Sequence, residues 1–191
     1  MDRCTNRVCP VSLACGLDNR IRRWFQNPEK ILAPFIQKGM TVMDMGCGPG
    51  FFTVALAELV GESGRVIAVD LQEGMLQKLG DKLRGTKLEK RITLHKCEED
   101  RLNVKEQADF VLAFYMIHEV PDKTRILKEI FDLLNPDGRF LMVEPKMFHV
   151  SEKAFKNTVN SARSAGFEAT EGPKVLFSWS AILRKADSSM Q

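Results

Sequence analysis

The sequence predicts an α/β protein in which one sheet of mostly parallel strands lies between two layers of helices. The first observation is that several short runs are apolar along nearly their whole length and alternate with amphipathic helical patterns, as in parallel sheets buried on both faces. The second is that the late strand-like runs 167–170 and 175–183 are separated only by residues 171–174. This gap is too short for a crossover helix, so these two strands should pair antiparallel. The expected fold is therefore a three-layer αβα sandwich with one late hairpin.

Hydrophobic periodicity and turn residues predict the individual elements. Strands are expected at residues 41–45, 65–70, 92–97, 109–114, 140–143, 167–170 and 175–183. Helices are expected at residues 18–25, 28–36, 51–60, 73–83, 123–134 and 155–165. Pro34 lies inside the second helical pattern and should kink or interrupt it, because proline cannot donate the helical hydrogen bond. Residues 135–138, Asn-Pro-Asp-Gly, predict a turn before the fifth strand.

The length of 191 residues suits one domain with one sizeable core. We assign residues 39–186 to this core. Residues 1–38 are expected to form an N-terminal arm with helices, a lid that belongs to the same domain. Residues 187–191 are expected to be a disordered tail.

The composition argues against several classes of protein. The net charge is only +3, and Lys and Arg are mixed with Asp and Glu, whereas nucleic-acid-binding proteins concentrate their basic residues. Five scattered cysteines are too few for a disulfide scaffold. No apolar run has the length of a membrane span, and the first residues do not read as a signal peptide. We therefore expect a cytoplasmic protein without nucleic-acid or membrane partners; its oligomeric state is not readable from the sequence.

The strongest motif is a glycine-rich loop directly after a predicted strand and directly before a predicted helix. Its candidate cofactor-binding residues are Asp44, Gly46, Cys47, Gly48, Gly50 and Phe51. Such a loop lies at the carboxyl end of a parallel sheet, where these folds bind ligands. A dinucleotide motif would require a third glycine at position 51, and the carboxylate of Asp44 would repel a diphosphate. Asp44 instead suits an ammonium group, and the loop amides suit a carboxylate.

A second acid ends the next predicted strand. Asp70 can accept hydrogen bonds from two ribose hydroxyls, and Leu71 beside it can pack against an adenine ring. The alternative is that Asp70 only caps the following helix, although a cap and a ribose acceptor are compatible. One acid at each end of a nucleoside that carries an amino acid describes S-adenosylmethionine, the cofactor that we expect.

These features together resemble the class I, Rossmann-like family of S-adenosylmethionine-dependent methyltransferases. The resemblance is carried by residues 44–50, Asp70, the strand 108–112 and the Leu134-x-Pro136-x-Gly138 turn, and it covers residues 30–185. It implies seven strands in the order 3-2-1-4-5-7-6, with strand 7 antiparallel. It also implies that Cys97 and Glu98 contact the adenine and that Ala113 and Phe114 lie beside the methionine moiety.

Three residues after the fourth strand are the catalytic candidates: Tyr115, His118 and Glu119. We expect them to face the transferred methyl group or its acceptor; the alternative for His118 is that it only caps the following turn. Glu144 and Pro145 follow the fifth predicted strand, where loops can shape an acceptor pocket. We expect no metal, because Cys4, Cys9 and Cys15 are spaced too widely for a zinc site. Reduced thiols are the default for them, with an arsenite-methylating role as the minor alternative.

The resulting hypothesis is a methyltransferase that acts on a small molecule. No inserted segment could grip a large partner, and the fourth strand is not followed by the Asn-Pro-Pro-Tyr motif of enzymes that methylate amino groups. The apolar pair Met147–Phe148 favours an apolar or thiol-containing acceptor, whose identity the sequence leaves open. Two alternatives stand beside it: a nicotinamide-dependent oxidoreductase, and a module that binds the cofactor without catalysis.

Overall fold

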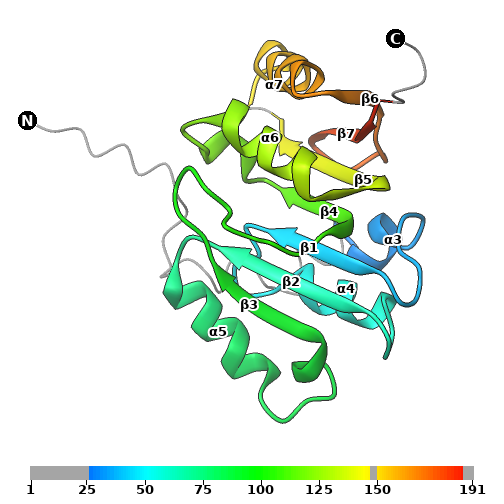
Figure 1. Ribbon diagram of the computed structural model, residues 1–191, viewed down its shortest axis with the longest axis vertical. Coiled ribbons are helices and arrows are strands. Elements are labelled where there is room, and N and C mark those ends of the chain that lie inside the picture. Colours follow the sequence, from blue (N-terminus) through cyan, green and yellow to red (C-terminus); the bar gives the residue numbers. More distant parts are fainter. Residues whose placement is uncertain (1–25, 147–149, 187–191) are drawn as a thin grey trace, which may run out of the picture.

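A single seven-stranded sheet forms the centre of the molecule. The computed structural model describes residues 26–146 and 150–186. The strands run in the order β3-β2-β1-β4-β5-β7-β6, from the bottom of Figure 1 to its top. Their bounds are β1 (Thr41–Met45), β2 (Arg65–Asp70), β3 (Ile92–Lys96), β4 (Ala108–Phe114), β5 (Leu134–Pro145), β6 (Phe167–Glu171) and β7 (Ser178–Lys185).

The pairing of the strands confirms the fold predicted from the sequence. Strands β1 to β5 pair in parallel, and β7 pairs antiparallel with both β5 and β6. The last two strands therefore form the late hairpin that the short gap between them required. Seven strands in the order 3-2-1-4-5-7-6, with strand 7 antiparallel, are the topology that the family resemblance implied.

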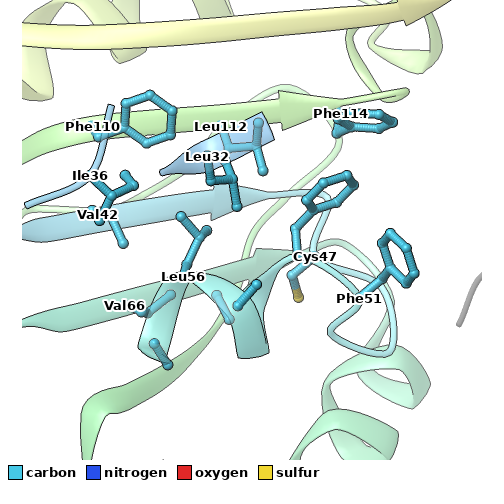
Figure 2. Close-up of a cluster of buried hydrophobic side chains, with 14 of the residues drawn as sticks. Leu32, Ile36, Val42, Cys47, Phe51, Leu56, Val66, Phe110, Leu112 and Phe114 are labelled. Carbon is cyan, nitrogen blue, oxygen red and sulfur yellow. The ribbon is translucent and has the colours of Figure 1, made fainter. Parts of the chain in front are cut away.

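Helices cover both faces of the sheet, so the three-layer prediction is also confirmed. The helices are α3 (Pro28–Leu32), α4 (Thr53–Leu59), α5 (Glu73–Leu83), α6 (Lys123–Leu133) and α7 (Glu152–Ser164), with short 3-10 turns η2 (Glu89–Arg91) and η3 (Ile117–Glu119). Helices α3, α4 and α5 pack on the face that holds Val42 and Leu112 (Figure 2). Helices α6 and α7 pack on the opposite face, against Met43 and Val111. This alternation along each strand is the period-2 pattern of a sheet buried on both sides.

Local sequence explains where the helices begin. The side chain of Asp122 caps α6 by accepting a hydrogen bond from the Arg125 amide at 3.0 Å. Ser151 caps α7 in the same way through the amide of Ala154. Such caps satisfy amides that have no partner within the helix. Helix α6 then buries one stripe of apolar side chains at helical spacing, namely Ile126, Leu127, Ile130 and Leu133.

Some predicted boundaries were wrong, and each error has a local cause. Helix α3 ends at Leu32 rather than at residue 36, as expected for a helix interrupted at Pro34. Helix α4 begins at Thr53, because the glycine loop continues through residues 51 and 52. The predicted turn at 135–138 lies inside β5, where the pairing with β4 shifts between Ala108 and Phe110. The predicted helix 18–25, the N-terminal arm and the tail lie outside the described residues.

The parallel strands place five loops at one edge of the sheet. Because β1 to β5 all run in the same direction, the residues that follow them meet at this edge. The glycine loop, Asp70, Cys97, Tyr115 and Glu144 all belong to this carboxyl edge. Within the described part of the chain, no helix has both the length and the apolar character needed to cross a membrane.

Candidate functional site

The glycine loop folds tightly across the end of β2. The amides of Gly46 and Cys47 both donate to the carbonyl of Val69, at 2.8 and 3.0 Å. Gly46 and Gly50 have φ angles of +73° and +88°, a region that side chains strongly disfavour. A Cβ at Gly46 would also lie 2.9 Å from the Cβ of Met116. Glycine at position 46 is therefore required both by the backbone and by the close approach of Met116.

Asp70 is buried at the end of β2 and holds this loop. Its Oδ2 accepts a hydrogen bond from the Gly48 amide and its Oδ1 accepts one from the Gln72 amide, both at 2.8 Å. The residue is 7% exposed, and burial raises the pKa of its carboxyl although these amides act in the opposite direction. The helix-cap alternative is wrong, because the N-cap of α5 is Gln72 and no side chain caps it.

Asp44 lies deeper than expected. It is 2% exposed, and one carboxylate oxygen accepts a hydrogen bond of 2.6 Å from the hydroxyl of Thr53, the first residue of α4. This contact joins β1 to the helix that follows the glycine loop. A carboxylate oxygen has two lone pairs, so the bond from Thr53 does not by itself prevent Asp44 from binding an ammonium group. Direct binding of an ammonium group by Asp44 stays a prediction.

A row of aromatic rings connects the glycine loop with the end of β4. The ring centroids of Phe51 and Phe52 are 5.1 Å apart, those of Phe52 and Phe114 are 4.2 Å apart, and those of Phe114 and Tyr115 are 4.5 Å apart. Figure 2 shows Phe51 and Phe114 at the same end of the sheet as Cys47. The thiol of Cys47 belongs to the core, where burial raises its pKa well above the usual range. The side chain of Cys47 therefore contributes to the packing of the core.

The residues expected near the adenine follow β2 and β3. The Cys97 amide donates to the carbonyl of Asp70 at 3.1 Å, so these two candidates are neighbours. Burial raises the pKa of the Cys97 thiol to about 11, which keeps it neutral. Leu71 is partly buried beside Asp70. The side chain of Glu98 turns to Asn103, whose amide donates to it at 3.2 Å.

The fourth strand contributes differently from what its sequence suggests. The side chain of Ala113 is fully buried on the face covered by α6 and α7, so only its backbone can reach a ligand. Phe114 faces the opposite core. Tyr115 then adopts a φ of +61°, and its hydroxyl accepts a 2.7 Å hydrogen bond from Gln26 and shares one of 2.6 Å with Ser178. Sequence reasoning missed Gln26 and Ser178, which lie 89 and 63 residues from Tyr115.

The second feature that the sequence did not reveal is a pair formed by His118 and Glu144. The distance from His118 Nδ1 to Glu144 Oε2 is 2.5 Å, and Glu144 Oε1 accepts a hydrogen bond of 2.9 Å from the Ile117 amide. Glu144 lies within β5 rather than in a loop, and it is 2% exposed. Burial alone would lower the pKa of His118, but the hydrogen bond and charge of Glu144 raise it above its ordinary value.

The described residues contain no group of three or more His, Cys, Asp or Glu side chains that could hold a metal ion. The three cysteines of the N-terminal arm, Cys4, Cys9 and Cys15, lie outside the part of the chain that the structure describes, as do Met147, Phe148 and His149.

Residues 36–185 match the protein family described as "Methyltransferase domain". The chain belongs to this family. Among similar proteins is the demethylmenaquinone methyltransferase of Lactobacillus johnsonii, which is 35% identical over 133 residues, 69% of this chain and 52% of that protein. The ubiquinone/menaquinone biosynthesis C-methyltransferase of Haemophilus ducreyi is 31% identical over 110 residues, which are 57% of this chain and 42% of that protein. The chain thus spans about half the length of these curated relatives.

Solved structures lead to the same family. A methyltransferase from Aquifex aeolicus, described as S-adenosylmethionine-dependent, superposes with a TM-score of 0.81 at 25% identity. The superposition covers 92% of this chain and 98% of that protein. This methyltransferase domain therefore shares nearly its whole described architecture with a solved methyltransferase.

The residues of this methyltransferase domain fit S-adenosylmethionine. A Cβ at Gly50 would lie 2.4 Å from Leu79 Cδ1. Glycine at this position therefore lets the loop pack closely on α5. Two buried carboxylates, Asp44 and Asp70, flank this loop. Acids suit an ammonium group and ribose hydroxyls, whereas they would repel a diphosphate. These two carboxylates therefore favour the cationic cofactor of this family.

The hydroxyl of Tyr115 should stabilise the methyltransferase domain. The substitution Tyr115→Phe removes its bonds to Gln26 and Ser178, and each lost hydrogen bond costs about 0.5–1.5 kcal/mol. We expect the melting temperature to fall by about 3–6 °C. Ser178→Ala removes the bond to Tyr115 together with the bond that the Ser178 hydroxyl donates to the Leu176 carbonyl, so it should give a comparable decrease. An unchanged melting temperature in Tyr115→Phe would show that this hydroxyl does not connect the three segments.

Glu119 should make the stability of the domain depend on pH. Burial, followed by the charges of Glu144 and Asp70, raises its pKa to about 7, although His118 opposes the shift. The folded-state pKa lies above the usual value for Glu, so the free energy of unfolding should fall as the pH rises from about 4.5 to 7. Glu119→Gln removes this cost, and at pH 8 we expect a gain of about 1–2 kcal/mol, since water still screens the partly exposed carboxyl.

Thermal unfolding at two pH values checks this prediction. Glu119→Gln should melt about 3–6 °C higher than the native protein at pH 8 and at nearly the same temperature at pH 4.5. The control is Glu58→Gln on the exposed face of α4, where a change within about 0.5 kcal/mol is expected. Equal shifts at both pH values would contradict the role of the Glu119 charge.

Proposed function

We propose that this chain transfers a methyl group from S-adenosylmethionine to a small molecule. The observation that carries the proposal is Asp70, a buried carboxylate held against the glycine loop by the Gly48 amide at 2.8 Å. Burial raises the pKa of the Asp70 carboxyl, so the charged form of this group lowers the stability of the fold at neutral pH. Such a group is expected where a ligand uses the charge.

Each end of the cofactor has candidate partners at the carboxyl edge of the sheet. Asp70 accepts the ribose hydroxyls, with Leu71, Cys97 and Glu98 around the adenine. The glycine-loop amides and Asp44 hold the aminoacyl group, and the methionine moiety lies beside the end of β4. When bound, the cofactor supplies an electrophilic methyl group on a sulfonium ion. The protein's task is to hold the acceptor in line with it, which can contribute up to about 7–11 kcal/mol.

The acceptor that we propose is an apolar ring compound of the quinone class, in its reduced form. Two of the relatives are named for the methylation of such compounds. Leu176 and Phe177 are 47% and 65% exposed, directly before β7, which begins opposite the carboxyl end of β5. The backbone there is fixed, since Phe177 has a φ of +55° and its carbonyl accepts from the Lys146 amide at 2.7 Å. This apolar edge favours a ring substrate over a nucleic acid.

Calorimetric titration with S-adenosylmethionine, S-adenosylhomocysteine and NADH tests the cofactor. Binding of the first two and not of NADH supports the proposal; binding of NADH alone would support the oxidoreductase alternative and reject it. Transfer of a radiolabelled methyl group to a prenylated 1,4-naphthoquinol then separates an enzyme from a module that only binds the cofactor. Binding without transfer to this compound would reject the proposed acceptor class.

A further inference from the structure

The pair of His118 and Glu144 lies beside Met116, the residue that packs on the glycine loop. Glu144 belongs to the end of β5, and His118 belongs to η3, which follows β4. Met116, the residue before η3, packs on Gly46 so closely that a Cβ there would lie 2.9 Å from its own Cβ. η3 follows β4 at the carboxyl edge of the sheet, the edge at which Asp70 ends β2. The pair therefore lies at the same edge as the cofactor residues.

The contacts of Glu144 fix how the imidazole is oriented. Its Oε1 accepts from the Ile117 amide, and its Oε2 lies 2.5 Å from Nδ1 of His118. A carboxylate can only accept hydrogen bonds, so the imidazole donates from Nδ1. In a neutral imidazole with its proton on Nδ1, Nε2 is the basic nitrogen. His118 is 22% exposed, whereas Glu144 is 2% exposed, so the acid is the internal member of the pair.

We propose that His118 is the general base of methyl transfer and that Glu144 is the residue that positions it. This inference rests on the proposed function. A buried acid hydrogen-bonded to a histidine is the arrangement by which enzymes hold an imidazole in its reactive tautomer. Glu144 does not touch the acceptor in this scheme and acts only through His118.

The step balances with the groups already named. The hydroxyl proton of the reduced ring passes to Nε2 of His118, which gives an imidazolium stabilised by Glu144. The ring carbon conjugated with the resulting oxyanion forms a bond to the methyl carbon, while the bond from methyl to sulfur breaks. The sulfur keeps that electron pair and becomes a neutral thioether. The ring hydrogen at the methylated carbon then passes to water as a proton, which restores the aromatic ring as its oxyanion, and the imidazolium of His118 returns its proton to that oxyanion.

Among the described residues, the charged groups that shift the pKa of His118 belong to β5, η3 and α6. Glu144 of β5 and Glu119 of η3 both raise the pKa of His118, and Lys123 at the start of α6 lowers it. The net direction is upward, so the imidazole should lose its proton above its ordinary pKa. The rate of methyl transfer should therefore rise with pH on an acidic limb that belongs to His118.

The first experiment compares the native chain with His118→Asn and Glu144→Gln, using S-adenosylmethionine and the prenylated 1,4-naphthoquinol. Asparagine keeps a donor for Glu144 but has no basic nitrogen, so kcat should fall by about 10²–10⁴ and the acidic limb should vanish. Glu144→Gln should shift that limb to lower pH. The matched control is His95→Asn in β3, which should keep the native rate because its Nε2 lies 2.8 Å from the Leu102 carbonyl and it belongs to no part of the proposed site.

Cofactor binding separates failure of this inference from failure of the proposed function. The dissociation constant of S-adenosylmethionine should stay within about twofold in His118→Asn, and this is measured by calorimetry. A native kcat and pH profile in that variant would overturn the role of His118 while the methyltransferase function stands. If the native chain binds no S-adenosylmethionine, the proposed function fails and this inference falls with it.

A second measurement needs no turnover. Nitrogen-15 chemical shifts of His118, in the native chain with S-adenosylhomocysteine, report which ring nitrogen carries the proton. We expect it on Nδ1 at pH above the transition, and a lower pKa of His118 in Glu144→Gln. A proton on Nε2 in the neutral ring would overturn the proposal.

Discussion

Replacing Asp70 with alanine should weaken the binding of S-adenosylmethionine by at least about 100-fold. We propose that the native carboxylate accepts two ribose hydroxyls, and hydrogen bonds to a charged group contribute about 1.5–3 kcal/mol each. The substitution also removes the acceptor of the Gly48 amide, so the loop that faces the aminoacyl group loses one of its fixed points. Two such bonds contribute about 3–6 kcal/mol together, so a 100-fold loss, about 2.7 kcal/mol, is the smallest change expected.

Two further variants make this measurement specific. Asp70→Asn keeps one carbonyl oxygen and should weaken binding less than Asp70→Ala. Asp81→Ala is the matched control, because Asp81 is an exposed acid on α5 whose partner is Arg84. Its removal changes the net charge equally and should leave the dissociation constant unchanged. Native affinity in Asp70→Ala, measured by calorimetry, would contradict the role of Asp70 in the cofactor site.

The strands and the late antiparallel pair could be predicted from local patterns in the sequence, whereas the order of the strands followed from the resemblance to the methyltransferase family. Runs such as 110–114 are apolar throughout, which predicts a strand buried on both faces, and the short gap before β7 predicts an antiparallel pair. Asp70 was found for a similar reason, since it immediately follows such a run. These signals lie within a few residues of one another along the chain.

The contacts that complete the site could not be predicted in this way. The bond between His118 and Glu144 joins residues 26 positions apart, and its geometry depends on where η3 lies along β5. Tyr115 was recognised as a candidate, but its partners Gln26 and Ser178 depend on a left-handed backbone at Tyr115 and on the register of β7. No local pattern encodes such a register. Ala113 was predicted to lie beside the methionine moiety of the cofactor. The pleat of β4 turns its side chain into the core covered by α6 and α7, so a contact could come only from its backbone.

Replacing Gly46 with alanine should lower the stability of the domain by about 2–4 kcal/mol. The φ of +73° costs a non-glycine residue about 1–2 kcal/mol. The new Cβ would also lie 2.9 Å from Met116 Cβ and 3.0 Å from its Cγ, atoms near the backbone of Met116 that cannot turn away, and such crowding adds about 1–3 kcal/mol. The melting temperature should therefore fall by about 10 °C.

A second glycine separates the two causes of this loss. Gly85 has nearly the same φ, +72°, but a Cβ there meets no atom within 4 Å, so Gly85→Ala should show the cost of the backbone alone. The excess loss in Gly46→Ala then measures the contact with Met116, and Met116→Ala should recover part of it in the double variant. Equal losses at both glycines would show that Met116 can yield. An excess that the double variant recovers would mean that the glycine loop and the segment carrying His118 are packed as one unit. The position of the proposed base would then depend on the loop that is proposed to bind the methyl donor.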